Sequence, residues 1–574
     1  MQQLKNQKKM KKLLFLFSII LSTVVFAQDT GSFYGGFESN TQWLLDDEGI
    51  LFDAPSDQLR SNNYFQLNYN LGKFTAGIQY EAYLPSALLG YSPVYDNQNG
   101  IAHYFLNYKD EKLDVTGGYF YEQFGSGLIL RTWEDRQLGV NNALRGIRVR
   151  FNATENLDLT GIYGQQRNGF EVSEGTVQGV DANYNLSNAL NLETVDLKVG
   201  ASYVGRYQDV NGNDTIPDVV SAFGGRLDFV IGNVYGGIEA NAKSKDVIAN
   251  EGQISTNKLY DGTSMQVNVG YAQKGFGVNG TFRRLENWSF YSDRLAEGNV
   301  FNQQILNYVP ALTKQQDYLL TNIYVYNSQP RLIIDSFDQR AGEVGTQFDL
   351  FYSFKKDSWA GKYKTKIAAN FSYWAGLDAE YNVENAFYDA KFVGNGSRLF
   401  RDFSVEVKNK WSKSLNTVFT FQDVIIDKGV SQGGPVGTQG EIHAYIAVLE
   451  ATYKFGGNKS VRAVAQHLFD KDGEKNITAE DGSFIDASRI DGNWAGGVVE
   501  YNFNSNYSLY VADSWNYGGQ GEEHYYNIGG SYTKGRVRAA MNYGRQRGGL
   551  ICVGGVCRFV PTNTGVSANL VVSF

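Results

Sequence analysis

Apolar and polar residues alternate along nearly the whole chain, and this period of two constrains the fold more than any other feature of the sequence. The segment 565–574 shows it most clearly, because every second residue counted back from the end is apolar. These residues are Phe574, Val572, Leu570, Ala568 and Val566. Successive side chains of a β-strand point to opposite faces, so this segment predicts a strand with one apolar and one polar face. A soluble β-sandwich contains such strands too, so the rest of the sequence is needed to distinguish a sandwich from a barrel.

The same alternation returns in many further segments, which are joined alternately by short polar turns and by longer polar loops. In 74–82, for example, Phe74, Ala76 and Ile78 share one face, and Thr75 lies on the other. A charged side chain facing lipid at the bilayer midplane costs about 2–4 kcal/mol, whereas a water-filled lumen accepts it. We therefore expect an all-β fold, a transmembrane up-and-down antiparallel β-barrel of about 24 strands, with a range of about 22–26.

Long external loops and short periplasmic turns are typical of such barrels, and an even strand count puts both termini in the periplasm. A barrel of more than about twenty strands leaves a wide lumen. Strand-like sequence already begins at 33–43, so any stopper for this lumen has to come from the loops. The loops that we expect to be external begin near Asp46, Phe124, Asp246, Leu285, Asp470 and Arg547.

Five lysines precede the apolar stretch 13–26, which predicts a signal peptide at 1–27 and leaves 28–574 as a single outer-membrane barrel domain. No other stretch is long and apolar enough for a spanning helix. The composition, with 64 Gly, 38 Tyr and 36 Phe but only 8 Pro, is typical of β-strands and of the aromatic girdles at the edges of a membrane barrel. The net charge of −8 disfavours nucleic acid as a partner. The expected partners are outer-membrane lipid and lipopolysaccharide, the barrel-assembly machinery during biogenesis, and proteins of the cell envelope.

The connection 124–145 is the first candidate for function. It mixes glycines, large apolar residues and charged residues, which is not typical of a solvent-exposed loop. Buried charges require partners. We expect either an inward-folded constriction, with its charges paired to each other and to the wall, or a packed external loop held by the same pairs. The candidate residues are Glu122, Arg131, Glu134, Asp135, Arg136, Arg145, Arg148 and Arg150.

The segment 285–341 is the second candidate, because it runs without clean alternation and a loop of this length usually carries a function. We expect it to be a plug or binding surface, or a structured cap without a ligand. Within it, 301–308 is expected to form a helical turn and 319–326 a strand of an external hairpin.

Cys552 and Cys557 are the only cysteines, and in an exported chain they predict a disulfide that closes the last external loop. The acidic loops at 46–57, 209–214 and 470–486 match no ordered calcium motif, so we expect solvated surfaces and no metal. No cofactor motif is present either.

Four histidines are present, and none accompanies a nucleophile motif, so an enzyme is the least favoured interpretation. They are His103, His443, His467 and His524.

The opening 33–38, the stretch 125–136 and the loop 552–561 resemble large single-chain outer-membrane barrels of Bacteroidota-type Gram-negative bacteria. In such barrels an aromatic last residue, here Phe574, serves as the C-terminal signal for barrel closure. The resemblance implies the fold and an outer-membrane location, and it implies no substrate.

Two functions remain from the sequence. The first is a porin-like passive or gated channel for a polar solute, with the lumenal charges setting selectivity. The alternative is a barrel component or scaffold of a multiprotein envelope assembly, related to secretion or gliding.

Overall fold

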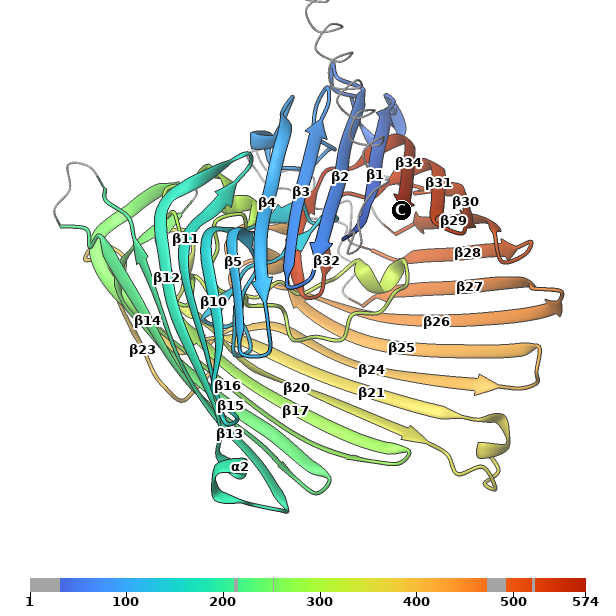
Figure 1. The fold of residues 1–574 in the computed structure, drawn as a ribbon. Helices are drawn as coiled ribbons and strands as arrows, with labels where there is room; N and C mark the ends of the chain where they lie inside the picture. Colours follow the sequence, from blue (N-terminus) through green and yellow to red (C-terminus); the bar gives the residue numbers. More distant parts are fainter. Residues whose placement is uncertain (1–30, 211–214, 251, 472–491, 519–521) are drawn as a thin grey trace, which may run out of the picture.

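Twenty-four strands form one closed antiparallel barrel in the computed structural model, which confirms the predicted fold class (Figure 1). The structure describes residues 31–210, 215–250, 252–471, 492–518 and 522–574, so the predicted signal peptide lies outside the described residues. Neighbouring strands pair in sequence order, and the last strand, β34, pairs with the first, β1. A two-sheet sandwich is therefore excluded.

The strands of the barrel wall have the following bounds. They are β1 (Ser32–Leu44), β2 (Leu59–Leu71), β3 (Phe74–Tyr83), β4 (Asn99–Lys109), β5 (Leu113–Phe120), β10 (Leu144–Thr154), β11 (Leu157–Asn168), β12 (Glu171–Asn185), β13 (Val195–Tyr207), β14 (Val219–Ile231), β15 (Val234–Asn250), β16 (Gln253–Gln273), β17 (Phe276–Glu286), β20 (Gly342–Ser353), β21 (Lys366–Gly376), β24 (Arg398–Lys410), β25 (Leu415–Asp427), β26 (Glu441–Gly456), β27 (Lys459–Asp470), β28 (Trp494–Asn502), β29 (Tyr507–Asn516), β30 (Asn527–Lys534), β31 (Val537–Gln546) and β34 (Asn563–Ser573).

Within the described residues, the connections contain only short elements. The strands are β6 (Gln123–Phe124), β7 (Leu130–Arg131), β8 (Glu134–Asp135), β9 (Val140–Asn141), β18 (Ile333–Ile334), β19 (Gln339–Arg340), β22 (Ala379–Asn382), β23 (Phe387–Ala390), β32 (Gly549–Val553) and β33 (Val556–Val560). The helices are α2 (Leu186–Leu190) and α3 (Lys428–Gln432), with 3-10 turns η1 (Glu48–Ile50), η2 (Pro93–Tyr95), η3 (Glu297–Phe301), η4 (Leu320–Asn322) and η5 (Gly361–Tyr363). In the described part of the chain, no helix has the length and apolar character needed to span a bilayer.

The two ends of the barrel differ in the length of their connections. One end, the turn end, carries the start of β1, the end of β34 and short connections such as 72–73, 232–233 and 274–275. Gly72, Gly232 and Gly275 have positive φ there, as tight hairpin turns require. The other end, the loop end, carries the long connections, among them 121–143, 287–341 and 547–562.

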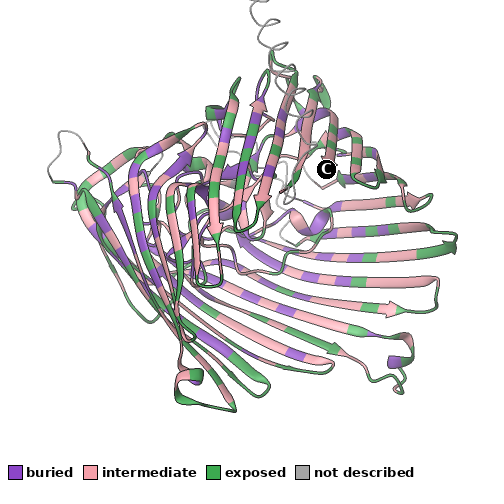
Figure 2. Ribbon diagram, in the orientation of Figure 1, coloured by how far each residue is buried: buried purple, intermediate pink, exposed green. Residues whose placement is uncertain are grey.

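Side chains alternate between the two faces of the wall as the sequence predicts (Figure 2). On β26, Leu449, Tyr453 and Phe455 point outward and are 54%, 45% and 57% exposed. Ile446 and Val448 point inward and are buried. The outward row supplies the apolar surface that a bilayer requires.

The closing strand β34 pairs with β1 in antiparallel register. Leu570 lies opposite Ser39, and Val572 lies opposite Phe37. The backbone of Phe574 exchanges hydrogen bonds of 3.0 and 3.1 Å with Gly35, which extends the pairing to the last residue.

Three local predictions are wrong. The helical turn expected at 301–308 lies earlier in the chain, because η3 covers Glu297–Phe301 and the left-handed conformation of Asn302 ends it. No loop begins near Asp246, because β15 continues to Asn250 and pairs irregularly with β16 beyond Lys243. The segment 319–326 forms no strand, and it contains the 3-10 turn η4 instead. Its apolar side chains are buried against the barrel wall, so no strand partner is needed to cover them.

Candidate functional site

The inward face of the wall changes character between the loop end and the turn end. On β14, Val220 and Ala222 near the loop end are followed by Arg226 and Asp228 toward the turn end. The inward residues of β26 change in the same order, from Ile446 and Val448 to Glu450, Thr452 and Lys454. A lumen filled with water would favour polar side chains throughout, so the apolar upper zone indicates that protein covers it.

Three connections from the loop end cover this upper zone. We call residues 121–143, 287–341 and 547–562 together the loop plug. Figure 1 shows the yellow-green connection after β17, together with β32, within the ring of strands. The three segments also contact one another, as described below.

The connection 121–143 packs on the wall formed by β11 to β14. Phe124, Ile129 and Leu130 are buried in one cluster with inward-facing Val177, Val204, Val220 and Ala222 of these strands. The backbone N–H of Ser126 donates to Glu239 Oε2 of β15 at 2.8 Å. This connection therefore lies against the inner wall rather than over its rim.

Five of the charged candidates around this connection belong to two ion-pair groups. At the wall, Arg150 donates to both oxygens of Glu122 at 2.8 and 2.9 Å, and Arg148 Nη2 lies 3.0 Å from Asp114. In the connection, Arg136 pairs with Glu134 at 3.0 Å and with Glu38 of β1.

The remaining candidates make contacts of other kinds. The guanidinium of Arg131 stacks on Tyr308 of 287–341 at 3.9 Å from the ring centroid. Asp135 caps the backbone N–H of Leu138 at 2.8 Å. Arg145 lies on β10 in register with Tyr119. The structure thus brings these residues to one side of the lumen, and whether they control passage stays a prediction.

The connection 287–341 reaches the opposite wall. Leu320, Ile323 and Tyr324 are buried in one cluster with inward residues of β25 to β28, including Val424, Ile446, Val464 and Trp494. The backbone N–H of Leu320 donates to Gln466 Oε1 at 3.0 Å. The tip of this connection therefore lies against β27, across the lumen from the wall that 121–143 covers.

A buried ion pair of the wall holds the middle of 287–341. Arg283 of β17 and Glu343 of β20 lie 2.8 Å apart, and both side chains are fully buried. Arg283 Nη1 donates to Pro310 O at 2.7 Å, and Glu343 accepts the backbone N–H of Gln329 at 2.6 Å. Glu343 also accepts the hydroxyl of Tyr326, whose pKa is raised well above its ordinary value by burial and by this carboxylate.

The third segment of the plug is the hairpin β32–β33, which the disulfide Cys552–Cys557 closes. Its turn contacts 287–341, because Ala311 N donates to Gly555 O at 2.7 Å and Tyr308 Oη donates to Gly554 O at 2.9 Å. Arg547 Nη2 donates to Asn322 O at 2.9 Å. The hairpin thus supports the longest loop of the plug.

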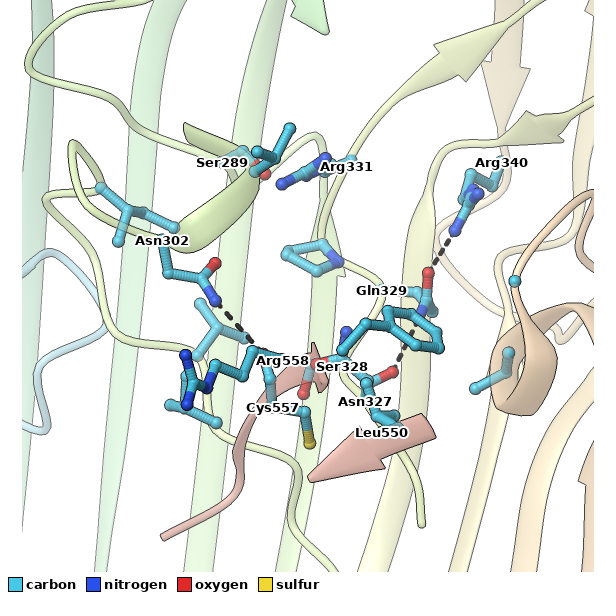
Figure 3. Close-up of a pocket in the computed structure, with 18 of the residues that line it drawn as sticks. Ser289, Asn302, Asn327, Ser328, Gln329, Arg331, Arg340, Leu550, Cys557 and Arg558 are labelled. Carbon is cyan, nitrogen blue, oxygen red and sulfur yellow. Dashed lines mark hydrogen bonds between the residues drawn. The ribbon is translucent and has the colours of Figure 1, made fainter. Parts of the chain in front are cut away.

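A pocket of about 360 Å³ lies between the segments of the plug and α3 (Figure 3). Its aromatic lining comes from Trp133, Tyr308 and Phe559, and Arg331, Arg340 and Arg558 carry its charges. Asn302, Asn327 and Gln329 add amide groups. A concave site with apolar rings and a few polar groups is the usual form of a small-molecule site.

A second, polar cavity of about 460 Å³ lies on the turn side of Gly125 and Ser126. Its lining side chains belong to the inward faces of β12 and β14 to β16. They include Asp181, Asn183, Arg226, Asp228, Glu239, Gln266 and Asn268. Below the plug, the lumen is therefore lined by charged and amide groups.

Sequence reasoning missed the pair Arg283–Glu343 and the pocket arginines Arg331 and Arg340 as functional candidates. Arg283 is an inward residue of an alternating strand, so the pattern gave it no special status. The signal that could have found the pair is a charge of opposite sign on each of the two strands that flank 287–341, a few residues from its ends.

The described residues contain no group of three or more His, Cys, Asp or Glu that could hold a metal ion. Of the acidic loops considered for calcium, 211–214 and 472–491 lie outside the described residues.

The fold and the plug define a class: a large antiparallel barrel of the outer-membrane type whose own loops enter the lumen. The chain belongs to a family of unknown function, DUF6029, whose model matches residues 8–574. A search of curated proteins finds no match.

Solved structures with low overall similarity include three large outer-membrane proteins. The outer membrane transporter YddB from Escherichia coli is 9% identical with a TM-score of 0.39, and the match covers 94% of this chain and 81% of that one. The P pilus usher (PapC) translocation pore is 8% identical with a TM-score of 0.40, covering 94% and 99%. The siderophore receptor PirA from Pseudomonas aeruginosa is 8% identical with a TM-score of 0.39, covering 96% and 81%.

Proposed function

We propose that the protein is a gated outer-membrane channel for a polar solute and that the loop plug is its gate. The observation that carries this proposal is the change of the inner wall from apolar to polar at the depth where the plug ends. The apolar zone provides a surface on which the plug packs. The polar zone provides a path lined by groups that replace water around a polar solute.

The way the plug is attached is consistent with a gate. Hydrogen bonds, apolar contacts, the ion pair of Arg136 with Glu38 and the cation–π contact of Arg136 with Tyr64 join the described plug residues to the wall. The disulfide lies within one segment of the plug. Because the plug is not cross-linked to the wall, it can move while the strands keep their pairing. A lumen closed by loops that can move favours a gated channel over an open, passive pore.

The proposal also includes an outer-membrane location and a protein that is not an enzyme. We place the loop end outside the cell and the turn end in the periplasm, with lipid and lipopolysaccharide around the outward row. His443 and His524 each contact a carboxylate, Asp423 at 2.9 Å and Asp513 at 2.7 Å. Both histidines lie near the loop-end rim, so their contacts are better explained as rim structure than as catalysis.

Single-channel conductance in planar bilayers tests the gate. Replacing residues 312–325 by a short Gly-Ser linker removes the tip that packs on β25 to β28, and we expect larger and more frequent conductance steps. The control deletes 383–386 at the tip of the β22–β23 hairpin, which lies outside the plug as defined, and should behave as the wild type. Equal conductance of the wild type and the plug variant would contradict a gate.

The scaffold alternative remains an outcome of the same experiment. Bilayers that stay silent with both proteins, together with partner proteins that co-purify from native membranes, would favour a component of an envelope assembly. The described structure contains no feature that favours this alternative over a channel.

A further inference from the structure

The pocket at the loop end is positively charged relative to its surroundings. Three arginines line it, and among its described lining residues none is acidic. On a chain with a net charge of −8, such a concentration of positive charge is unexpected. A pocket with guanidinium groups and no carboxylates attracts anions.

Arg331 carries the least compensated of these charges. Arg340 is paired with Asp338, and Arg558 donates to two backbone carbonyls, Gly90 O at 2.6 Å and Gln137 O at 2.9 Å. For the half-buried Arg331, neither an ion pair nor a hydrogen bond is found within the described part of the chain. Figure 3 shows its side chain at the pocket beside Ser289.

Buried donors without a partner surround the same space. They are the hydroxyl of Ser289 and the Nε–H groups of Arg340 and Arg558, which find no acceptor among the described residues. A buried donor that lacks an acceptor destabilises the protein, so each such group indicates an acceptor that is supplied from elsewhere. An oxyanion has several acceptor oxygens and suits guanidinium groups in particular.

We propose that this pocket binds a small polar solute that carries a carboxylate, sulfate or phosphate group. Arg331 supplies the main charge contact, and Ser289, Arg340 and Arg558 supply further donors. The rings of Trp133, Tyr308 and Phe559 contact the uncharged part of the solute. The volume of about 360 Å³ fits a molecule of the size of a small sugar acid or sugar phosphate.

The source of the oxyanion is a free solute rather than a lipid headgroup. All segments of the pocket belong to the loop plug or to the neighbouring α3 connection at the loop end. The outward row of the wall, which faces lipid, contributes none of the named groups. The inference deepens the proposed function, because it names the class of solute for the same channel.

Binding is measured by isothermal titration calorimetry on the full chain in a non-ionic detergent. The probes are glucuronate, glucose 6-phosphate and inorganic sulfate, with glucose as the neutral match and lipopolysaccharide micelles as the lipid arm. We expect the two sugar anions to bind at least about tenfold more tightly than glucose, and their affinity to fall as salt is added. The variant R331Q should lose about tenfold of this affinity.

The matched control is K356Q, which removes one positive charge from an exposed residue of the turn between β20 and β21. It should bind as the wild type does. Heat-modifiable migration on gels shows whether R331Q still forms the barrel.

The inference would be overturned by no binding of any anionic probe, by equal binding of glucose and the sugar anions, or by unchanged anion binding by R331Q. Binding by lipopolysaccharide alone would do the same. Anion binding without any conductance effect of the plug variant would refute the gate and leave the inference intact. A working gate without anion binding would refute only the inference.

Discussion

Arg283 and Glu343 connect the barrel wall to the loop plug through a single buried ion pair. The pair itself joins two wall strands, and its remaining hydrogen bonds go to Pro310, Ser328, Tyr326 and Gln329 of the plug. Replacing such a pair by apolar residues is often tolerated, whereas removing one partner leaves a buried charge uncompensated at a cost of about 3–5 kcal/mol. A change at Glu343 should therefore loosen the plug before it affects the strands.

The variant E343Q tests this at the residue scale. It leaves Arg283 without its counter-charge, so we expect a protease to cut within 311–330 at least about tenfold faster, while the barrel keeps its heat-modifiable migration. The control is E500Q, because Glu500 is one-third exposed and lies 3.9 Å from Arg462 in the polar zone. Equal cleavage rates in E343Q and E500Q would refute an anchoring role for the pair.

The sequence identifies some of these residues better than others. Glu122, Arg148 and Arg150 stand beside a Gly-rich connection, and their charges are close enough in sequence to predict pairing. Arg283 and Glu343 are separated by the whole of 287–341, so no local pattern relates them. Their partnership depends on the pairing of β17 with β20, which only the fold supplies.

At the scale of elements, the hairpin β32–β33 acts as a support for the plug. The disulfide closes a loop of a few residues, which in the chain-entropy model stabilises it by about 2 kcal/mol. The carbonyls of Gly554 and Gly555 at its turn accept hydrogen bonds from Tyr308 and Ala311. The order of the hairpin is therefore linked to the order of 287–341.

Reduction of the disulfide should loosen both segments. With dithiothreitol, we expect faster proteolysis within 547–562 and within 300–327, and more frequent conductance fluctuations, in the wild type. The double variant C552S/C557S should show these properties without the reagent and should not respond to it. If mass spectrometry shows full reduction and neither segment is cut faster, the hairpin does not support the plug.

The element 319–326 shows where sequence patterns fail. Its β-branched and aromatic residues favour a strand, because such residues need a surface on which to pack. The inner wall of the barrel provides that surface, and Leu320, Ile323 and Tyr324 are buried without strand pairing. Contacts between a loop and a distant wall leave no period in the sequence, so the plug could be suspected only from the mixed composition of 124–145 and from the length of 285–341.

At the scale of the whole molecule, the sequence predicts the barrel well. The requirement that each strand have one lipid-facing row acts on every strand independently, so it is visible in residues such as Leu449, Tyr453 and Phe455. The inward-facing residues are less constrained. They are apolar where the plug covers them and polar below it, and this boundary between the apolar and polar zones is visible only when the strands are aligned in register.

The most direct test of a barrel filled by its own loops measures the accessibility of two inward positions and one outward position on the same strand. Single spin labels at Val448, Leu449 and Thr452 of β26, in protein reconstituted into lipid vesicles, are exposed to oxygen and to a water-soluble nickel complex. We predict that oxygen reaches 449, that the nickel complex reaches 452, and that neither reagent reaches 448 beneath the plug. Nickel accessibility at 448 equal to that at 452 would contradict the plug, and nickel accessibility at 449 would contradict the barrel.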